Sequence, residues 1–393
     1  MITRRRMFAS LAAAAVAGPG LALIAPRALG AVTDGSSTKA AGALPLTLAN
    51  NTGEFANSSV YLYIVGNQDG KQVRVKADGT LAPIALSDNG SDGYTDYAIP
   101  LASSGETTLS LPYMSGRIYV ALGSKLKFKA VTDGAGNAAL QYPAGWVASD
   151  PNYDVLHDCA EFTYNSSGMF CNTTMVDMFS VPMSIRLTGS ADQTTGTLVA
   201  GGRDKVFSAV RAVDAFAPLV VSDKRVIAPG HGLDSGLFAA DYLASYIDQA
   251  WSTYAGKDLT VTTNAGAFTG RVSGDKLSFT GPASVSFSKP STRDVLFCDG
   301  ALAAPNDGTT GPVAAVLGAA FNRTTLVSTA SQPTTDPASF YRTAVTNHYA
   351  KAVHSVMADG RAYGFAFDDV ADFASYIQDT APTGVRLNLT SFS

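Results

Sequence analysis

The sequence predicts a mainly β protein whose second half mixes α-helices with β-strands, and three observations lead to this fold class. Up to about residue 190, short β-branched and aromatic runs alternate with clusters of Gly, Asn and Asp, which is typical of antiparallel strands and hairpins. After Gly189, apolar residues recur at helical spacing. With 37 Gly, 18 Pro, 46% hydrophobic and only 15% charged residues, the chain is too apolar for disorder and too rich in turns for a coiled coil.

The β-rich part begins with short strand candidates at residues 46–48, 60–65, 73–75, 108–111, 118–122 and 126–131. Gly134-Ala135-Gly136 resembles a dinucleotide-binding loop, but Gln141-Tyr142-Pro143 follows where a helix should begin, so a hairpin turn is favoured. From residue 154 to 187 two or three longer strands follow, with a turn at Asn165-Ser166-Ser167-Gly168. No helix is expected before about residue 190.

The second half carries three helix candidates. Apolar spacing predicts helices over residues 209–216 and 235–254, and Asp336 as N-cap with Pro337 at the first helical position predicts a third, to about residue 357. Strand candidates recur at residues 259–263, 276–280, 284–287, 295–297, 363–367 and 385–389. We therefore predict a β-rich domain over residues 45–189 and a mixed domain over residues 190–393, with the terminal strands able to return to the first.

The first thirty residues have the pattern of a cleavable export signal, and residues 31–44 that of a linker. A basic cluster precedes an alanine-rich apolar stretch, and Arg5-Arg6-Met7-Phe8 matches the twin-arginine signal of bacteria. The alternative is a membrane-spanning helix, which the break at Gly18-Pro19-Gly20 disfavours. We expect a protein secreted or exported to the periplasm already folded, with a mature chain that begins near Ala31.

Charge and cysteine content exclude several function classes. Without the four arginines of the first thirty residues, 24 basic residues face 32 acidic ones, a balance of −8 that argues against nucleic-acid binding. The three cysteines, Cys159, Cys171 and Cys298, allow at most one internal disulfide, and whether Cys159 and Cys171 are joined stays open. No zinc-site spacing occurs. We expect no cofactor, no metal, no membrane association and a monomer.

Two carboxylates stand out between residues 158 and 187. Only three acidic residues are glutamates, and Glu161 lies within an apolar strand, where alternation places it on one face with Cys159 and Thr163. Asp177 follows the returning strand, so the two acids can meet across a groove. Solvated or salt-bridged strand carboxylates are the equally open alternative.

These residues are part of a wider resemblance. The sequence resembles the bacterial β-1,3-glucanases of glycoside hydrolase family 64, relatives of the thaumatin-like proteins, from Pro45 to the C-terminus. The resemblance is densest in the segments Glu161-Phe162-Thr163-Tyr164-Asn165, Asn172-Thr173-Thr174-Met175-Val176-Asp177, Asn347-His348-Tyr349 and Tyr363-Gly364-Phe365-Ala366-Phe367-Asp368-Asp369-Val370.

The resemblance implies a thaumatin-like barrel or sandwich domain packed against a mixed α/β domain, with a wide open groove for a β-1,3-glucan between them. It implies an inverting hydrolase that releases short laminari-oligosaccharides such as the pentasaccharide, with Glu161 as general acid and Asp177 as general base. The matching groove positions are Thr163, Asn165, Phe170, Thr174, Asp368 and Asp369. Phe170 stands where the family often has Trp.

Two other functions remain open at this stage. A thaumatin-like glucan-binding protein without catalysis would keep the groove but could lose either acid, whereas Glu161 and Asp177 are both present. A structural or inhibitory secreted protein has no evident use for the helix-containing second half. An inverting mechanism needs an acid that is held protonated, and the apolar sequence neighbours of Glu161, Phe162 among them, favour it for that role.

Overall fold

The computed structural model describes residues 43–392, so the predicted export signal and most of the linker lie outside the described residues. The chain divides into two units, each built from separate stretches of sequence. The first comprises residues up to Thr174, Ser180–Leu198 and the residues from Tyr376 onward, and the second Met175–Phe179 and Val199–Ser375. Among the helices of residues 43–392, none is both long and apolar enough to cross a membrane.

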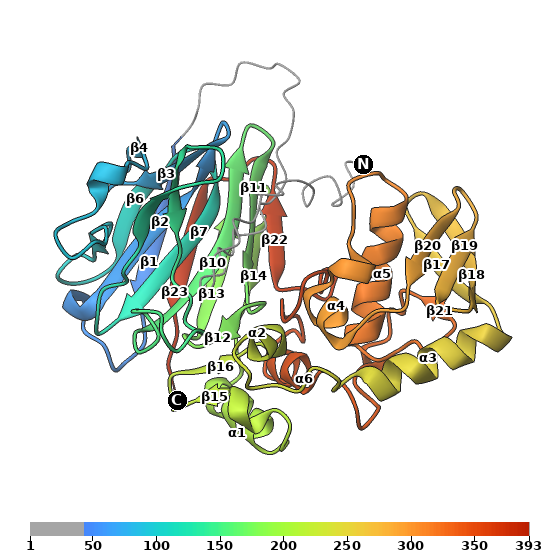
Figure 1. Cartoon of the computed structure of the whole chain (residues 1–393). Helices are drawn as coiled ribbons and strands as arrows, with labels where there is room; N and C mark the ends of the chain where they lie inside the picture. The colour runs from blue at the N-terminus through green and yellow to red at the C-terminus, as the bar shows by residue number, and fades with distance from the viewer. Residues whose placement is uncertain (1–42, 393) are drawn as a thin grey trace. The chain divides into compact units, whose positions relative to one another are not determined.

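The first unit is a β-sandwich of two sheets (Figure 1). The five-stranded sheet has the order β14 (Asp192–Thr195), β13 (Met183–Thr188), β23 (Gly384–Leu389), β1 (Leu44–Asn50) and β6 (Thr107–Leu111). The eight-stranded sheet has the order β22 (Tyr376–Asp379), β11 (Gly168–Thr173), β10 (Leu156–Asn165), β7 (Met114–Leu122), β2 (Val60–Gln68), β3 (Lys71–Val75) and β4 (Leu81–Pro83), with β5 (Ile99–Pro100) beside β2. The pairing is antiparallel except between β1 and β23.

One hydrophobic core joins the two sheets. Its residues alternate along the strands of both, for example Leu46 and Leu48 on β1 and Ile118 and Val120 on β7. A second cluster covers one end of the outer face of the larger sheet, where Tyr63, Tyr119 and Cys159 pack under the hairpin of β8 (Lys129–Thr132) and β9 (Ala138–Gln141). The predicted turns of both hairpins, β8–β9 and β10–β11, are confirmed.

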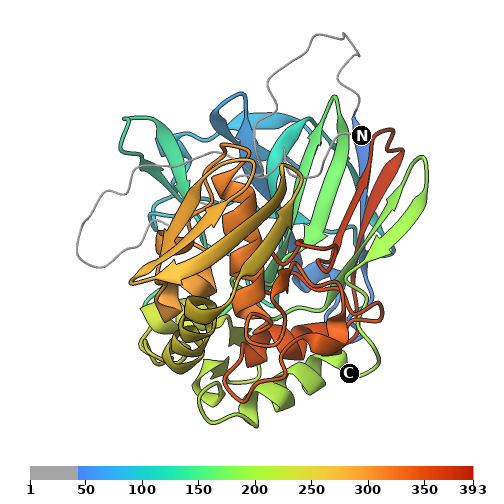
Figure 2. The same cartoon turned by 90° about the vertical axis from the view of Figure 1, so that its right-hand side faces the viewer.

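The second unit mixes helices with two small sheets. A three-stranded sheet has the order β12 (Met178–Phe179), β16 (Arg225–Ile227) and β15 (Val220–Val221), and a five-stranded one β20 (Val285–Ser288), β19 (Lys276–Thr280), β18 (Gly266–Ser273), β17 (Leu259–Thr263) and β21 (Ser331–Gln332). The helices are α1 (Gly202–Arg211), α2 (Pro229–Asp234), α3 (Ala244–Gly256), α4 (Thr292–Phe297), α5 (Thr310–Asn322) and α6 (His348–Ser355). Helix α5 contacts β17, and Figure 2 shows the gold strands beside the orange helix.

Several predicted elements of this half are wrong in extent or type. Residues 295–297 are not a strand but the end of α4, because Ser291 accepts a hydrogen bond from the backbone N–H of Asp294 and starts a helix. The helix expected over residues 235–254 begins only at Ala244 and ends at Gly256, after a turn in which Gly236 has a left-handed φ of +71°. The third helix breaks because Asp336 caps a single turn, Pro337–Ser339, and Tyr341 has a φ of +56°.

The first helix, expected over residues 209–216, instead spans Gly202–Arg211. The strand expected at residues 363–367 does not form, since this segment lies in turns that lead to Asp368. Up to residue 190 no α-helix occurs among the described residues, as predicted.

Candidate active site

The outer face of the eight-stranded sheet carries two of the polar residues that the sequence singles out, Glu161 and Thr163. Along β10, Ala160, Phe162 and Tyr164 enter the sandwich core, so Glu161 and Thr163 point to the opposite face, as alternation predicts. Cys159 also lies on that face, under the β8–β9 hairpin. The outer face is therefore apolar under that hairpin, and Glu161 and Thr163 lie beyond it.

Glu161 lies in a row of directly opposed residues. Arg117 on β7 is its partner on one side and Asn172 on β11 its partner on the other. Arg117 donates to Oε1 of Glu161 from Nε at 3.1 Å and from Nη2 at 2.9 Å, and Asn172 donates from Nδ2 to Oε2 at 3.3 Å. The Glu161 side chain keeps 14% of its surface exposed. Cross-strand register thus gives each carboxylate oxygen its own donor.

This setting corrects the expectation that Glu161 is surrounded by apolar groups. Phe162 is its neighbour in sequence, but the alternation of the strand turns that ring into the core on the other face. The immediate neighbours of the carboxylate are a guanidinium and an amide instead. Arg117 also donates to the hydroxyl of Tyr119 at 3.4 Å, and burial raises the pKa of Tyr119 well above 10, so that hydroxyl stays protonated.

Thr163 and Phe170 occupy the next row of the same face. Thr163 shares a hydrogen bond of 3.0 Å with Ser115, and Phe170 lies opposite Thr163 on β11. Phe170 is only 3% exposed, so its ring offers little surface to a sugar, in contrast to the groove position that the resemblance implies. Asn165 begins the β10–β11 turn and accepts from the N–H of Ser167 at 2.8 Å. Thr174, just after β11, is also buried.

Asp177 belongs to the second unit, where it directly precedes β12. Its backbone carbonyl accepts from the N–H of Ala228 at 3.0 Å, which ties it to the residue before α2. Its Oδ1 lies 2.9 Å from Nε2 of His231 on α2, and because a carboxylate only accepts, that nitrogen carries the hydrogen. The side chain of Asp177 is 18% exposed and that of His231 is 4% exposed. His231 therefore fixes one oxygen of a partly accessible carboxylate.

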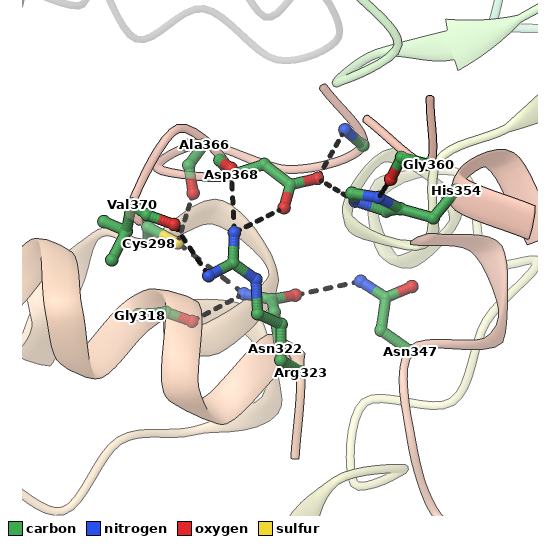
Figure 3. A network of polar contacts seen from close by, with 11 residues as sticks. Cys298, Gly318, Asn322, Arg323, Asn347, His354, Gly360, Ala366, Asp368 and Val370 are labelled. Carbon is green, nitrogen blue, oxygen red and sulfur yellow. Dashed lines mark hydrogen bonds and ion pairs between the residues drawn. The ribbon is translucent and has the colours of Figure 1, made fainter. Parts of the chain in front are cut away.

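Asp368 lies at the centre of a buried polar network in the second unit (Figure 3). Nη2 of Arg323, the residue that follows α5, donates to Oδ1 of Asp368 at 3.0 Å. Oδ2 accepts from Nε2 of His354 at 2.8 Å and from the N–H of Gly364 at 2.9 Å. With 0% of its surface exposed and both oxygens engaged, Asp368 has no free surface for a sugar, so the expectation of direct contact is corrected. Asp369 is partly exposed.

The network continues into three helices. Asn322 of α5 donates from Nδ2 to the carbonyls of Val295 and Gly318, at 2.7 and 3.0 Å. Asn347 donates to Oδ1 of Asn322 at 2.9 Å and caps α6 by accepting from the N–H of Ala350 at 3.0 Å. The segment Tyr363-Gly364-Phe365-Ala366-Phe367-Asp368 is thus fastened to α4, α5 and α6, and the residues that carry the resemblance there serve packing.

His354 is held as a cation in this network. Its Nδ1 lies 2.8 Å from the carbonyl of Gly360 and its Nε2 faces Asp368, and since both partners only accept, both nitrogens carry hydrogen. Burial alone lowers the pKa of His354, but the Asp368 carboxylate and the Gly360 carbonyl outweigh it, and the pKa is raised above 6.5.

We expect the free energy of unfolding to fall as the pH rises above 6.5, the ordinary pKa of histidine. A raised pKa in the folded state means that the stabilisation is complete below 6.5 and is lost as the pH passes through the folded pKa. Urea unfolding at several values from about pH 5 to pH 9 measures this slope. His354→Gln should lower stability at acidic pH and flatten the curve above 6.5. An unchanged slope in the variant would contradict the assignment.

The three cysteines are free thiols. Cys171 lies in the sandwich core and Cys159 on the opposite face of the same sheet, so the open question of a bond between them is answered by strand alternation. Among residues 43–392, no group of three or more His, Cys, Asp and Glu side chains is arranged to hold a metal ion.

Three functional candidates escaped the sequence analysis: Arg117, Asn172 as a side-chain partner of Glu161, and His231. Each is a candidate only because its side chain contacts Glu161 or Asp177. The contacting residues are 11 to 54 positions apart in the chain. The one usable signal was a basic residue beside the strand predicted over residues 118–122. Strand register, which one sequence does not give, was needed to pair it with Glu161.

Comparison with known proteins shows which family shares this chain's features. The family model described as "Beta-1,3-glucanase", of glycoside hydrolase family 64, matches residues 42–389. A curated relative from Cellulosimicrobium cellulans, named glucan endo-1,3-beta-glucosidase, is 34% identical over 405 residues, an alignment that covers 99% of this chain and 71% of the relative.

Solved structures give the same result for the fold. A laminaripentaose-producing β-1,3-glucanase in complex with laminaritetraose superimposes with a TM-score of 0.81 and 37% identity, covering 89% of this chain and 99% of that one. A β-1,3-glucanase domain from Clostridium beijerinckii gives a TM-score of 0.78 and 30% identity, covering 90% of this chain and all of that one.

Proposed function

The chain belongs to glycoside hydrolase family 64 and is a glucan endo-1,3-β-glucosidase, and from this premise we propose that Glu161 and Asp177 are its catalytic acid and base. In an inverting reaction a carboxylic acid protonates the leaving oxygen while a carboxylate activates water on the other face of the sugar, with roughly 6.5 to 9.5 Å between the two groups. The main support is that each carboxylate is partly exposed and fixed through one oxygen by a nitrogen donor, Arg117 for Glu161 and His231 for Asp177.

The reaction proceeds as a single displacement. Asp177, held through Oδ1 by His231, accepts a proton from water as the water oxygen attacks the anomeric carbon. The bond from that carbon to the glycosidic oxygen breaks, and the proton on Glu161 passes to the departing oxygen. Glu161 is left as a carboxylate, which Arg117 stabilises. The two residues exchange their protons with solvent before the next turnover.

The substrate is a β-1,3-glucan, and the products are short laminari-oligosaccharides. A relative with 37% identity was solved with laminaritetraose and is named for laminaripentaose production. Sugar hydroxyls call for hydrogen-bonding partners, which the partly exposed Asn165 and Asp369 can supply. Thr163, Phe170, Thr174 and Asp368 are left out because all four are buried.

Incubation with laminarin and with curdlan, followed over time by separation of the oligosaccharides, tests this function. A dominant product of about five units is expected from the resemblance to laminaripentaose-producing enzymes. Glucose as the first product would contradict internal cleavage. Glucan binding without any release would leave a binding protein with the same fold.

We further propose that the twin-arginine motif Arg5-Arg6-Met7-Phe8 exports the protein in bacteria. Replacing Arg5 and Arg6 with Lys should leave precursor in the cytoplasm, as measured by fractionation and immunoblotting. Unchanged export would contradict the twin-arginine route and leave the enzymatic proposal untouched.

A further inference from the structure

The two oxygens of Glu161 have different partners, and this difference decides which of them can hold a proton. Oε1 faces two N–H groups of Arg117, and a guanidinium donates but never accepts. A hydrogen on Oε1 would point at donors. Oε2 faces only the side-chain amide of Asn172 among the described residues of the first unit. The acid proton therefore belongs on Oε2.

Asn172 can bond this oxygen in either protonation state. Its side chain is 1% exposed, and among the described residues its Oδ1 has no hydrogen-bond partner. Nδ2 donates to Oε2 at 3.3 Å, which suits a carboxylate. When Oε2 carries a hydrogen, a half-turn of the amide presents Oδ1 as the acceptor. Because Oδ1, at the other end of the Asn172 amide, has no hydrogen-bond partner in the part of the chain that the structure describes, the protonation state of Glu161 determines how the amide is turned.

Resting on the proposed function, we infer that Asn172 is a positioning residue whose amide turns as Glu161 gains and loses the acid proton on Oε2. Before the bond breaks, Oδ1 accepts the hydrogen of Oε2 and keeps the acid form available. When the O–H bond of Glu161 breaks, its electron pair stays on Oε2 and the proton goes to the leaving glycosidic oxygen. Nδ2 then turns back to donate to the new carboxylate.

The other ionisable groups near Glu161 on this face do not compete with Asn172 as the hydrogen-bond partner of Oε2. In the first unit they are Arg117 and Tyr119 on β7, Cys159 on β10 and Tyr376 on β22. Arg117 and Tyr119 bond to each other, and Tyr119 stays protonated because burial raises its pKa. Cys159 lies under the β8–β9 hairpin, and the hydroxyl of Tyr376 donates to Gln378 at 2.9 Å.

Side-chain NMR on protein labelled with ¹⁵N-asparagine tests the inference without any glucan. The amide signal of Asn172, assigned as the one missing from Asn172→Thr, should move between two positions with pH. Glu161→Gln imitates the protonated acid, because Arg117 holds the amide oxygen and the amide nitrogen replaces the O–H donor. In that variant the signal should stay at its low-pH position. A signal that ignores pH, or one that titrates equally in Glu161→Gln, would overturn the inference.

Kinetics supply a second readout from a matched pair of variants. Thr and Val have the same shape, but only the Thr hydroxyl can both donate and accept. Asn172→Thr should keep a kcat on the order of tenfold above that of Asn172→Val, as expected for one hydrogen bond, with KM nearly equal in both. Equal kcat in the two variants would contradict the proton-linked role. If the unmodified protein did not hydrolyse glucan but the Asn172 signal still moved with pH, the proposed function would be contradicted and the inference about Asn172 would stand.

Discussion

Glu161→Gln and Asp177→Asn will each lower kcat on laminarin by roughly 10² to 10⁴-fold, the usual contribution of a general acid or base. Both variants keep the shape and the hydrogen-bonding side chain, so Arg117 can still donate to residue 161 and His231 can still contact residue 177. Glucan binding should therefore persist. Initial rates at saturating laminarin and pull-down on curdlan measure the two properties separately.

Glu106→Gln is the matched control for this experiment. Glu106 is another of the three glutamates of the chain, and it pairs on the surface with Arg386. Its loss should leave kcat within about a factor of two, since exposed ion pairs contribute little even to stability. A similar fall in kcat for Glu106→Gln would mean that the assay reports general damage to the protein.

The anomer released first distinguishes the two possible roles of Asp177. Inversion at a β-1,3 linkage gives an α product, which NMR detects before mutarotation. A β product would mean retention through a covalent intermediate, which requires carboxylates only about 5 to 5.5 Å apart. In that case Asp177 would be a nucleophile rather than a base, and the role of His231 would be to orient the attacking oxygen.

The strands of the first unit were predictable because their signals are local. Strand alternation alone predicted that Glu161 and Phe162 lie on opposite faces of the sheet. The turn residues Asn165-Ser166-Ser167-Gly168 predicted the hairpin. The helices of the second unit were harder to predict from sequence. Left-handed residues such as Tyr341 interrupt apolar patterns that otherwise read as continuous helix.

The sequence singled out the two acids that we propose as catalytic, but it did not indicate their partners. Motif context singled out Glu161 and Asp177, whereas Arg117 and His231 are partners only because of register and tertiary packing. For Asp368 the resemblance itself was misleading. It implied that Asp368 and Asp369 line the sugar groove, but the carboxylate of Asp368 faces the buried side chains of Arg323 and His354 instead.

Asp368→Asn will lower the free energy of unfolding by about 3 to 5 kcal/mol, the typical cost of removing one partner from a buried ion pair. The substitution removes the carboxylate that faces both Arg323 and His354, two side chains with 2% and 11% of their surface exposed. Urea unfolding followed by circular dichroism measures the change. Asp192→Asn is the control, because Asp192 pairs with Arg186 on the surface, where solvent screens the pair, and its loss should change the free energy of unfolding far less.

The same variant should remove the pH dependence assigned to His354, and this separates an electrostatic effect from a loss of packing. The carboxylate of Asp368 is what raises the pKa of His354 against burial. Without that carboxylate, burial and the nearby Arg323 both favour the neutral imidazole. Arg323 keeps its bond to the Val370 carbonyl and the face of the Phe340 ring, 4.8 Å away, so its charge stays partly compensated. A stability curve that still falls above pH 6.5 in Asp368→Asn would show that another group titrates there.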